Sequence, residues 1–175
     1  MNRIQLLPLG EVALTLLAAL QKGLTKEFAA ACEILPSEPD PSYAWNVRRQ
    51  QYSSTEILAA LAARQIPLDA RLLAVTPFDL FIPILTFVFG EAQLDGRCAV
   101  VSAFRLRQEY YGLPSNHELL ASRLVKESAH ELGHTLGIAH CEDYGCVMAP
   151  SHGVEWIDLK STSLCESCRG LVQAR

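Results

Sequence analysis

The chain has 175 residues, a length typical of a single domain. Half of its residues are hydrophobic and 19% are charged, which excludes a disordered or low-complexity chain. The net charge of −4 argues against a nucleic-acid backbone or an anionic membrane as the main partner. We therefore expect neither nucleic acid nor membrane among its partners.

Apolar stretches long enough to span a membrane are not expected, although the mean hydropathy is +0.15. Residues 12–20 form too short a run, and residues 78–89 are interrupted by Asp79 and Pro83, whereas a span needs about 18 to 20 apolar residues. The interrupted apolar run near the N-terminus also fits a secretory signal poorly. The default expectation is a cytoplasmic, reducing environment, in which disulfides are disfavoured.

Strand-like and helix-like stretches alternate through the first two thirds of the chain. This alternation favours an α/β fold with a mostly parallel twisted sheet, to which the last hairpin adds an antiparallel strand. The three prolines of residues 36–41 predict a loop, and residues 94–96 predict a turn. In chain order, the expected elements are a strand at 4–9, a helix at 12–22 that ends before Gly23, a strand at 27–35, a helix at about 53–65 capped by Ser53 or Ser54, and strands at 71–76, 86–93 and 98–104.

A long helix is predicted after Pro114. Ser115 and Glu118 stand three residues apart, which is the spacing of a capping box. A stripe of residues spaced mostly by four would face the core: Leu120, Leu124, Ser128, Leu132 and Leu136. From this pattern alone the segment would simply be a core helix.

The end of this helix carries His130, Glu131 and His134. Residues four apart lie about 40° around a helix and about 6 Å along it, so the two imidazoles can bind one zinc ion. Glu131 would lie beside the metal rather than on it, where it can act as general base toward a zinc-bound water. A pair of core histidines is the alternative for this segment taken alone.

His140 strengthens the metal interpretation. In an unbroken helix it would lie about 9 Å beyond His134 and about 240° around the axis, too far to share an ion. Gly137 is placed to end the helix, because glycine adopts the left-handed conformation at low cost. We therefore predict that the chain doubles back after Gly137. Three histidines would then leave one coordination position open, as in catalytic zinc sites.

Four of the six cysteines lie in the last 35 residues. Two short-spaced pairs separated by 18 residues indicate a closed four-thiolate zinc site, with two disulfides as the alternative. We expect the two isolated cysteines, Cys32 and Cys98, to be small buried residues. The paired cysteines are Cys141 with Cys146, and Cys165 with Cys168.

The pattern HExxHxxGxxH over residues 130–140 resembles the zinc motif of the metzincin metallopeptidases. Together with Met148 and the four clustered cysteines, it resembles the archaemetzincins, also called archaelysins. Residues 48–52 and 87–92 are also similar to segments of that family, so the resemblance extends over about residues 48–168.

This resemblance implies a metzincin-like fold, with a long active-site helix and a small C-terminal subdomain clamped by zinc. It implies a zinc metallopeptidase with two zinc ions per chain, one catalytic and one structural, and Glu131 as the catalytic residue. Met148 would form the turn beneath the metal. The implied ligands are His130, His134 and His140 for the catalytic zinc, and Cys141, Cys146, Cys165 and Cys168 for the structural zinc.

We expect one catalytic domain over residues 1–175, divided into subdomains 1–137 and 138–175. The expected substrate is a peptide or protein, and the expected state is a monomer. The architecture of the family implies that the substrate would add as an extended strand along residues 86–93. Tyr144 and Arg105 are candidate helpers in stabilising the oxyanion.

Two other interpretations of the function stay open. The protein could bind peptides at zinc without hydrolysing them, although Glu131 argues against this, or it could be a purely structural two-zinc protein. His117 is expected to be solvated, and His152 to have a surface or core role rather than to line the cleft.

Overall fold

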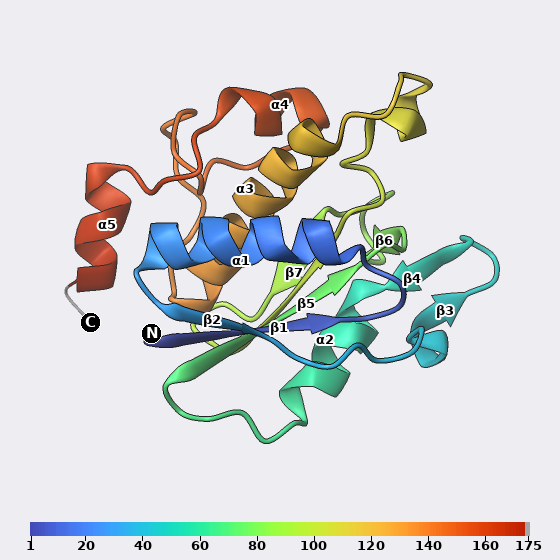
Figure 1. Ribbon diagram of the computed structural model, residues 1–175, viewed down its shortest axis with the longest axis horizontal. Helices are drawn as coiled ribbons and strands as arrows, with labels where there is room; N and C mark the ends of the chain where they lie inside the picture. The colour runs from blue at the N-terminus through green and yellow to red at the C-terminus, as the bar shows by residue number, and fades with distance from the viewer. Residues whose placement is uncertain (174–175) are drawn as a thin grey trace.

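The computed structural model describes residues 1–173. Its main element is a five-stranded β-sheet (Figure 1). The strand order is β2-β1-β5-β8-β7, and every pairing is parallel except that of β7 with β8. This confirms the predicted α/β fold with a mostly parallel sheet and one antiparallel strand. The strands are β1 (Arg3–Pro8), β2 (Ala31–Ile34), β5 (Ala70–Thr76), β7 (Gly90–Ala92) and β8 (Cys98–Ser102).

Helices cover both faces of this sheet (Figure 1). Side chains alternate between the faces of a strand, so β5 divides its apolar residues between two cores. Leu73 and Val75 belong to the core beneath α1 (Leu14–Phe28) and α3 (His117–Thr135). Leu72 and Ala74 pack on the other side, in the core that contains α2 (Ser54–Ala62).

A second, three-stranded sheet was not predicted from the sequence. Its order is β3-β4-β6, with β3 antiparallel and β6 parallel to β4. Its strands are only two or three residues long, too short to show a hydrophobic period. The members are β3 (Trp45–Asn46), β4 (Gln51–Ser53) and β6 (Leu80–Phe81). The remaining elements are two 3-10 turns, η1 (Ser42–Ala44) and η2 (Gln108–Tyr111), and the helices α4 (Val154–Leu159) and α5 (Glu166–Gln173).

The first helix is longer than predicted. It passes through Gly23 to Phe28, and the left-handed turn falls at Ala29, with φ of 49°. Gly23 serves helix packing instead, because a Cβ there would lie 2.7 Å from Cγ1 of Val125 on α3. The expected strand at 27–35 is correspondingly wrong at its start, since β2 begins at Ala31.

The two predicted helix caps have different outcomes. Ser53 caps α2 as expected, its Oγ accepting the Glu56 backbone N–H at 3.3 Å. The capping box of Ser115 and Glu118 is wrong, because α3 begins one residue later. Asn116 is the cap, and its Oδ1 accepts the Leu119 N–H at 2.9 Å.

The predicted strand 86–93 is also too long. Only Gly90–Ala92 pairs with β8, whereas Val88 forms an isolated bridge with Leu80 of the small sheet. The next strand is close to its prediction but ends at Ser102. Within the described residues 1–173, no helix combines the length and the apolar character needed to span a bilayer.

Candidate active site

The last turns of α3 carry the histidine pair, and the chain then reverses as predicted. Gly137 has φ of 75°, and its N–H bonds to the His134 carbonyl at 2.8 Å. The Ile138 N–H bonds to the Gly133 carbonyl at 3.1 Å. These two bonds form a Schellman motif, the helix ending that favours glycine at the left-handed position. The reversal brings His140 back beside His134.

The three imidazole rings converge on one point. The ring centroid of His130 lies 4.6 Å from that of His134 and 5.2 Å from that of His140. The centroids of His134 and His140 are 5.0 Å apart. One ring nitrogen from each lies within 4.8 Å of the others. The arrangement thus allows all three residues to bind one metal ion.

The hydrogen bonds of the rings also fit a metal ion. Nδ1 of His130 lies 2.9 Å from the Val147 carbonyl, and Nδ1 of His134 lies 2.8 Å from the Ile138 carbonyl. A carbonyl oxygen can only accept, so each Nδ1 carries the proton. Burial lowers the pKa of all three histidines, which favours neutral rings. The Nε2 lone pairs of His130 and His134 then face each other at 3.0 Å, an arrangement that a shared cation stabilises.

Glu131 is buried against the edge of the large sheet. A Cβ at Gly90 would lie 2.7 Å from both Cγ and Oε1 of Glu131, so the glycine of β7 makes room for this carboxyl group. Burial, followed by the charges of Glu127 and Glu91, raises the pKa of Glu131 well above its usual range, although Lys160 opposes the shift. A carboxyl group with a raised pKa can both take up and release a proton near neutral pH.

A buried ion pair next to Glu131 was not predicted from the sequence. Lys160 Nζ lies 2.8 Å from Glu127 Oε1, and both residues are almost fully buried. The ammonium group also donates to the Ala149 carbonyl at 3.2 Å. The pair therefore connects α3 to the turn that contains Met148. No local spacing could reveal it, because its members are 33 positions apart in the chain.

Met148 packs against Gly133 of α3, the residue directly before His134. Its side chain is fully buried, and a Cβ at Gly133 would overlap its Sδ. The Met148 carbonyl accepts the Cys141 N–H at 3.0 Å. The turn therefore supports both α3 and the chain that follows His140.

A cleft of about 470 Å³ lies over the histidines. That volume suits a ligand-binding site. Its walls include the segment 85–92 and the residues Pro150, Ser151 and His152. The floor comprises Glu127, His130, Glu131, His134 and His140. His152 is exposed, as a surface role requires, but it also lines the cleft, so the expectation that it does not line the cleft is wrong.

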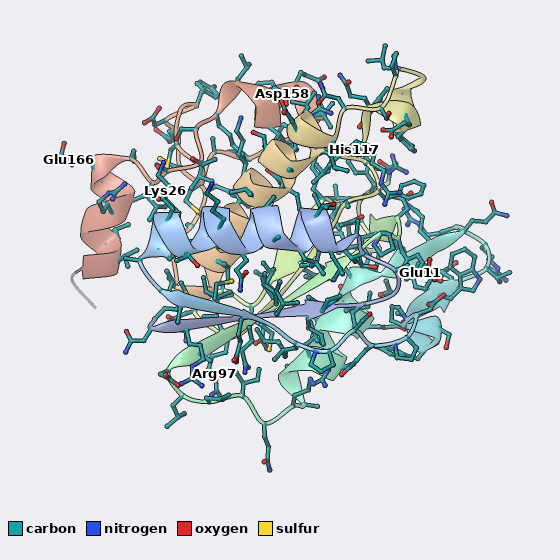
Figure 2. The ribbon with its side chains drawn as sticks, in the orientation of Figure 1. Glu11, Lys26, Arg97, His117, Asp158 and Glu166 are labelled. Atoms are coloured by element: carbon teal, nitrogen blue, oxygen red, sulfur yellow. The ribbon has the colours of Figure 1, made fainter. Side chains whose placement is uncertain are left out.

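Three other candidates lie outside this cleft. Arg105 is paired with Asp79, with Nε 2.7 Å from Oδ1. Tyr144 is largely exposed, and its ring lies 5.9 Å from that of Trp156. His117 is exposed in the first turn of α3, as expected (Figure 2). Neither Arg105 nor Tyr144 is therefore placed to stabilise an oxyanion over the histidines.

The C-terminal cysteines form a second cluster. The four Sγ atoms of Cys141, Cys146, Cys165 and Cys168 lie within 4.8 Å of one another. The Cys141 and Cys165 sulfurs are 3.8 Å apart, far longer than a disulfide bond of about 2.05 Å. Cys146 Sγ accepts the backbone N–H groups of Cys165 at 3.3 Å and Met148 at 3.5 Å. Four free thiols so arranged fit a tetrahedral zinc ion better than two disulfides.

The two isolated cysteines have different environments. Cys98 is buried in β8, as predicted. Cys32 is only half-buried in β2, so the expectation of a fully buried residue is wrong there. Burial still raises the pKa of the Cys32 thiol to about 11.

Comparison with known proteins gives a consistent result. The model of Peptidase family M54 matches residues 41–174. An archaemetzincin of Methanocaldococcus jannaschii is 42% identical over 173 residues, which cover 99% of this chain and 94% of that protein. An archaemetzincin of Haloarcula marismortui is 36% identical over 95% of this chain and 96% of its own length.

Solved structures share the fold over nearly the whole chain. The archaemetzincin of Archaeoglobus fulgidus, crystallised with malonate, has a TM-score of 0.84 and 37% identity, covering 97% of this chain and 99% of that one. A zinc-dependent peptidase of Methanocorpusculum labreanum has a TM-score of 0.88 and 28% identity, with the same coverage.

Proposed function

The chain belongs to peptidase family M54, the archaemetzincin family of zinc metallopeptidases, and we propose that it hydrolyses peptide bonds with Glu131 as general base. The observation that carries the proposal is the convergence of three imidazoles on the floor of a cleft, with a buried carboxyl group beside them.

His130, His134 and His140 would hold the catalytic zinc. When bound, zinc polarises a carbonyl group and lowers the pKa of a water molecule to about 7. The backbone carbonyls of Val147 and Ile138 fix the tautomers of His130 and His134, so each ring presents its Nε2 lone pair to the metal.

Glu131 moves the proton. Its raised pKa lets the carboxylate take a proton from the attacking water and then release it to the leaving amine. Gly90 keeps the space around the carboxyl group open, and Lys160 limits the rise in its pKa. The reaction consumes one water and yields a new carboxyl group and a new amine.

The peptide would bind as an added strand beside β7, at the edge of the large sheet. The Ser102 N–H bonds to the Phe89 carbonyl at 2.8 Å, and the Gln93 N–H bonds to the Cys98 carbonyl at 3.0 Å. In an antiparallel ladder this pattern makes Gly90 and Ala92 the positions whose backbone groups point away from β8. Those groups face the open edge that borders the cleft.

The four-cysteine cluster would hold a second, structural zinc. Four thiolates complete a tetrahedral shell and leave no position for a substrate. Cys141 follows His140 directly, and its N–H bonds to the Met148 carbonyl. The second ion would therefore order the segment that presents His140. The subdomain boundary after residue 137, the monomeric state and the cytoplasmic location stay predictions.

The test is an unbiased digest of a diverse peptide library, read by mass spectrometry. Wild type and Glu131→Gln are compared after zinc content has been measured in both. We expect cleavage by wild type, and a loss of at least about a hundredfold in the variant at equal zinc content. Equal peptide binding with no cleavage by wild type would support the non-hydrolytic binding module. Zinc at full occupancy with neither binding nor cleavage would support a purely structural protein.

A further inference from the structure

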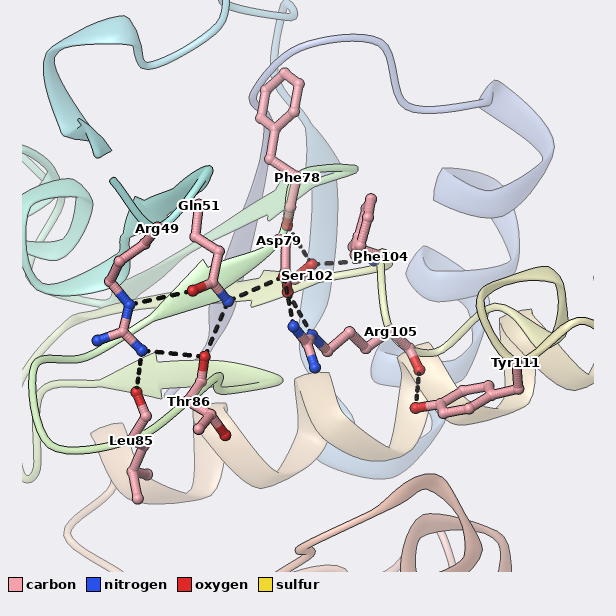
Figure 3. A network of polar contacts seen from close by, with 10 residues as sticks. All are labelled: Arg49, Gln51, Phe78, Asp79, Leu85, Thr86, Ser102, Phe104, Arg105 and Tyr111. Atoms are coloured by element: carbon pink, nitrogen blue, oxygen red, sulfur yellow. Dashed lines mark hydrogen bonds and ion pairs between the residues drawn. The ribbon is translucent and has the colours of Figure 1, made fainter. Parts of the chain in front are cut away.

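One wall of the cleft includes a segment that lies outside the named strands and is joined to the small sheet only by the bridge between Val88 and Leu80. Residues 85–88, here called the rim, lead into β7 and line the cavity. Segments without regular pairing are mobile unless side chains hold them. The rim is held by polar contacts from Arg49 and Gln51, which lie two residues apart (Figure 3), and by an aromatic contact from Arg105, a second and distant part of the chain.

Arg49 makes the first of these contacts. Its Nη2 donates to the Leu85 carbonyl at 2.6 Å and to the Thr86 carbonyl at 3.2 Å (Figure 3). Its guanidinium carbon lies 4.3 Å from the centre of the Phe81 ring. The planar guanidinium group of Arg49 is thus packed against Phe81 on one side, and it donates to two successive backbone carbonyls.

Gln51 makes the second contact, from a buried position on β4. Its Nε2 donates to the Thr86 carbonyl at 3.0 Å and to Asp79 Oδ2 at 2.9 Å. Its Oε1 accepts from Nε of Arg49 at 3.2 Å. The amide therefore joins Arg49 and Asp79 into one network around the rim.

Arg105 makes the third contact, through an aromatic ring. It binds Asp79 through two bonds of 2.7 Å each, which hold its guanidinium group in place. The guanidinium carbon lies 4.2 Å from the centre of the Phe87 ring and 4.9 Å from that of Tyr110. The side chain of Phe87 therefore packs on a fixed cation.

These contacts decide which rim groups are available to a peptide. The carbonyls of Leu85 and Thr86 already accept bonds from the protein, and the Val88 N–H bonds to the Leu80 carbonyl at 2.9 Å. These three backbone groups are satisfied within the protein, and they fix the segment that leads into β7. Backbone geometry fixed before binding removes an ordering cost that would otherwise weaken the complex.

We propose that Arg49, Gln51 and Arg105 are positioning residues for substrate, which hold the rim so that an extended peptide binds along it and β7. The inference rests on the proposed function for the identity of the peptide ligand. It assigns these residues to peptide binding rather than to the metal site or to the chemical step.

The test compares two zinc ligands on the zinc-loaded protein. A fluorescent peptide hydroxamate reaches both the zinc and the rim, whereas acetohydroxamate reaches the zinc alone. We expect Arg49→Lys to weaken the peptide hydroxamate about tenfold, because lysine keeps the charge and loses the fork. The Kd of acetohydroxamate should stay within about twofold. Arg48→Lys is the matched control, because its side chain is exposed, and both Kd values should be unchanged.

A second variant and a second readout separate positioning from general folding. Arg105→Lys should weaken the peptide hydroxamate in the same selective way, because it loses the paired bonds to Asp79. In both variants, amide hydrogen exchange should accelerate in residues 84–88 and stay unchanged in α3. With a peptide found in the library digest, KM should rise about tenfold while kcat changes less than about twofold.

The outcomes distinguish this inference from the proposed function. If wild type cleaves no peptide, the proposed function fails, and the ratio of the two hydroxamate affinities still decides the role of the rim. An unchanged peptide hydroxamate Kd in both lysine variants overturns the inference. Equal weakening of both hydroxamates also overturns it, because the residues would then act on the metal site.

Discussion

Gly133 lies directly against the sulfur of Met148, so the middle of the zinc motif and the turn beneath it fit only because position 133 has no side chain. A Cβ added there would overlap Sδ and lie 3.0 Å from Cε of the methionine. Gly133 stands between Glu131 and His134, on the part of α3 that presents both. A change that pushes Gly133 and Met148 apart should therefore move His134, a proposed zinc ligand.

Gly133→Ala should destabilise the protein by about 1–3 kcal/mol through overpacking and should weaken zinc binding at the histidines. The double variant with Met148→Ala should lose at least about 1 kcal/mol less free energy of unfolding than the two single variants lose together, because the two residues are in contact. Urea unfolding and zinc titration measure both effects. Gly170→Ala on α5 is the control, since nothing lies within 4 Å of its added Cβ. Strict additivity would show that the contact does not limit the packing.

Lys160→Met should be strongly destabilising, by about 3–5 kcal/mol, because it leaves the buried Glu127 carboxyl group without its partner. Burial already raises the pKa of Glu127, so the lone group would bind a proton rather than stay charged. The double variant Lys160→Met with Glu127→Leu should regain most of the loss, because it removes the unpaired group. Urea denaturation at pH 7 tests this, and a double variant no more stable than the single one contradicts it.

The pH dependence of stability should reveal the raised pKa of Glu131. A folded-state pKa above the ordinary value of 4.5 gives stability that is full below pH 4.5 and is lost as the pH rises through the folded pKa. Glu131→Gln does not titrate and escapes that loss. With the histidine-site metal removed by dipicolinate, the variant should therefore gain stability over wild type between pH 5 and pH 8. If the difference in unfolding free energy between the variant and wild type stays constant across this pH range, the pKa of Glu131 is not raised.

Cys165→Ala should remove the zinc held by the cysteines and also weaken the three-histidine site. The coupling runs through Cys141, which follows His140 and donates its N–H to the Met148 carbonyl. Zinc stoichiometry and competition with a chromophoric chelator measure the two sites separately. Cys32→Ala is the control, since Cys32 lies on β2, outside the cluster. Unchanged affinity at the histidines in Cys165→Ala would refute the coupling.

The parts of the site that the sequence predicted depend on local spacing. The reversal at Gly137 follows from one residue type at one offset, and the interval between His130 and His134 follows from the helical repeat. The cysteine pairs are likewise short-range patterns. Each of these features is determined within about ten residues, so the sequence suffices to recognise it.

The features that were missed depend on distant contacts. Lys160 meets Glu127, and Arg49 meets Leu85, only because the chain folds back over more than thirty positions. Gly23 was misread for a related reason, because its role is to admit Val125 from another helix. A glycine that ends a helix and one that packs against a neighbour look alike until the neighbour is known.

The most direct test of the account is zinc-edge anomalous diffraction from crystals of the protein as purified. We predict two peaks per chain, one about 2.0–2.1 Å from a ring nitrogen of each of His130, His134 and His140, and one about 2.3 Å from the four clustered sulfurs. A map with no peak among the histidines at full zinc content, or with His140 turned away from the peak, would contradict the proposed catalytic centre.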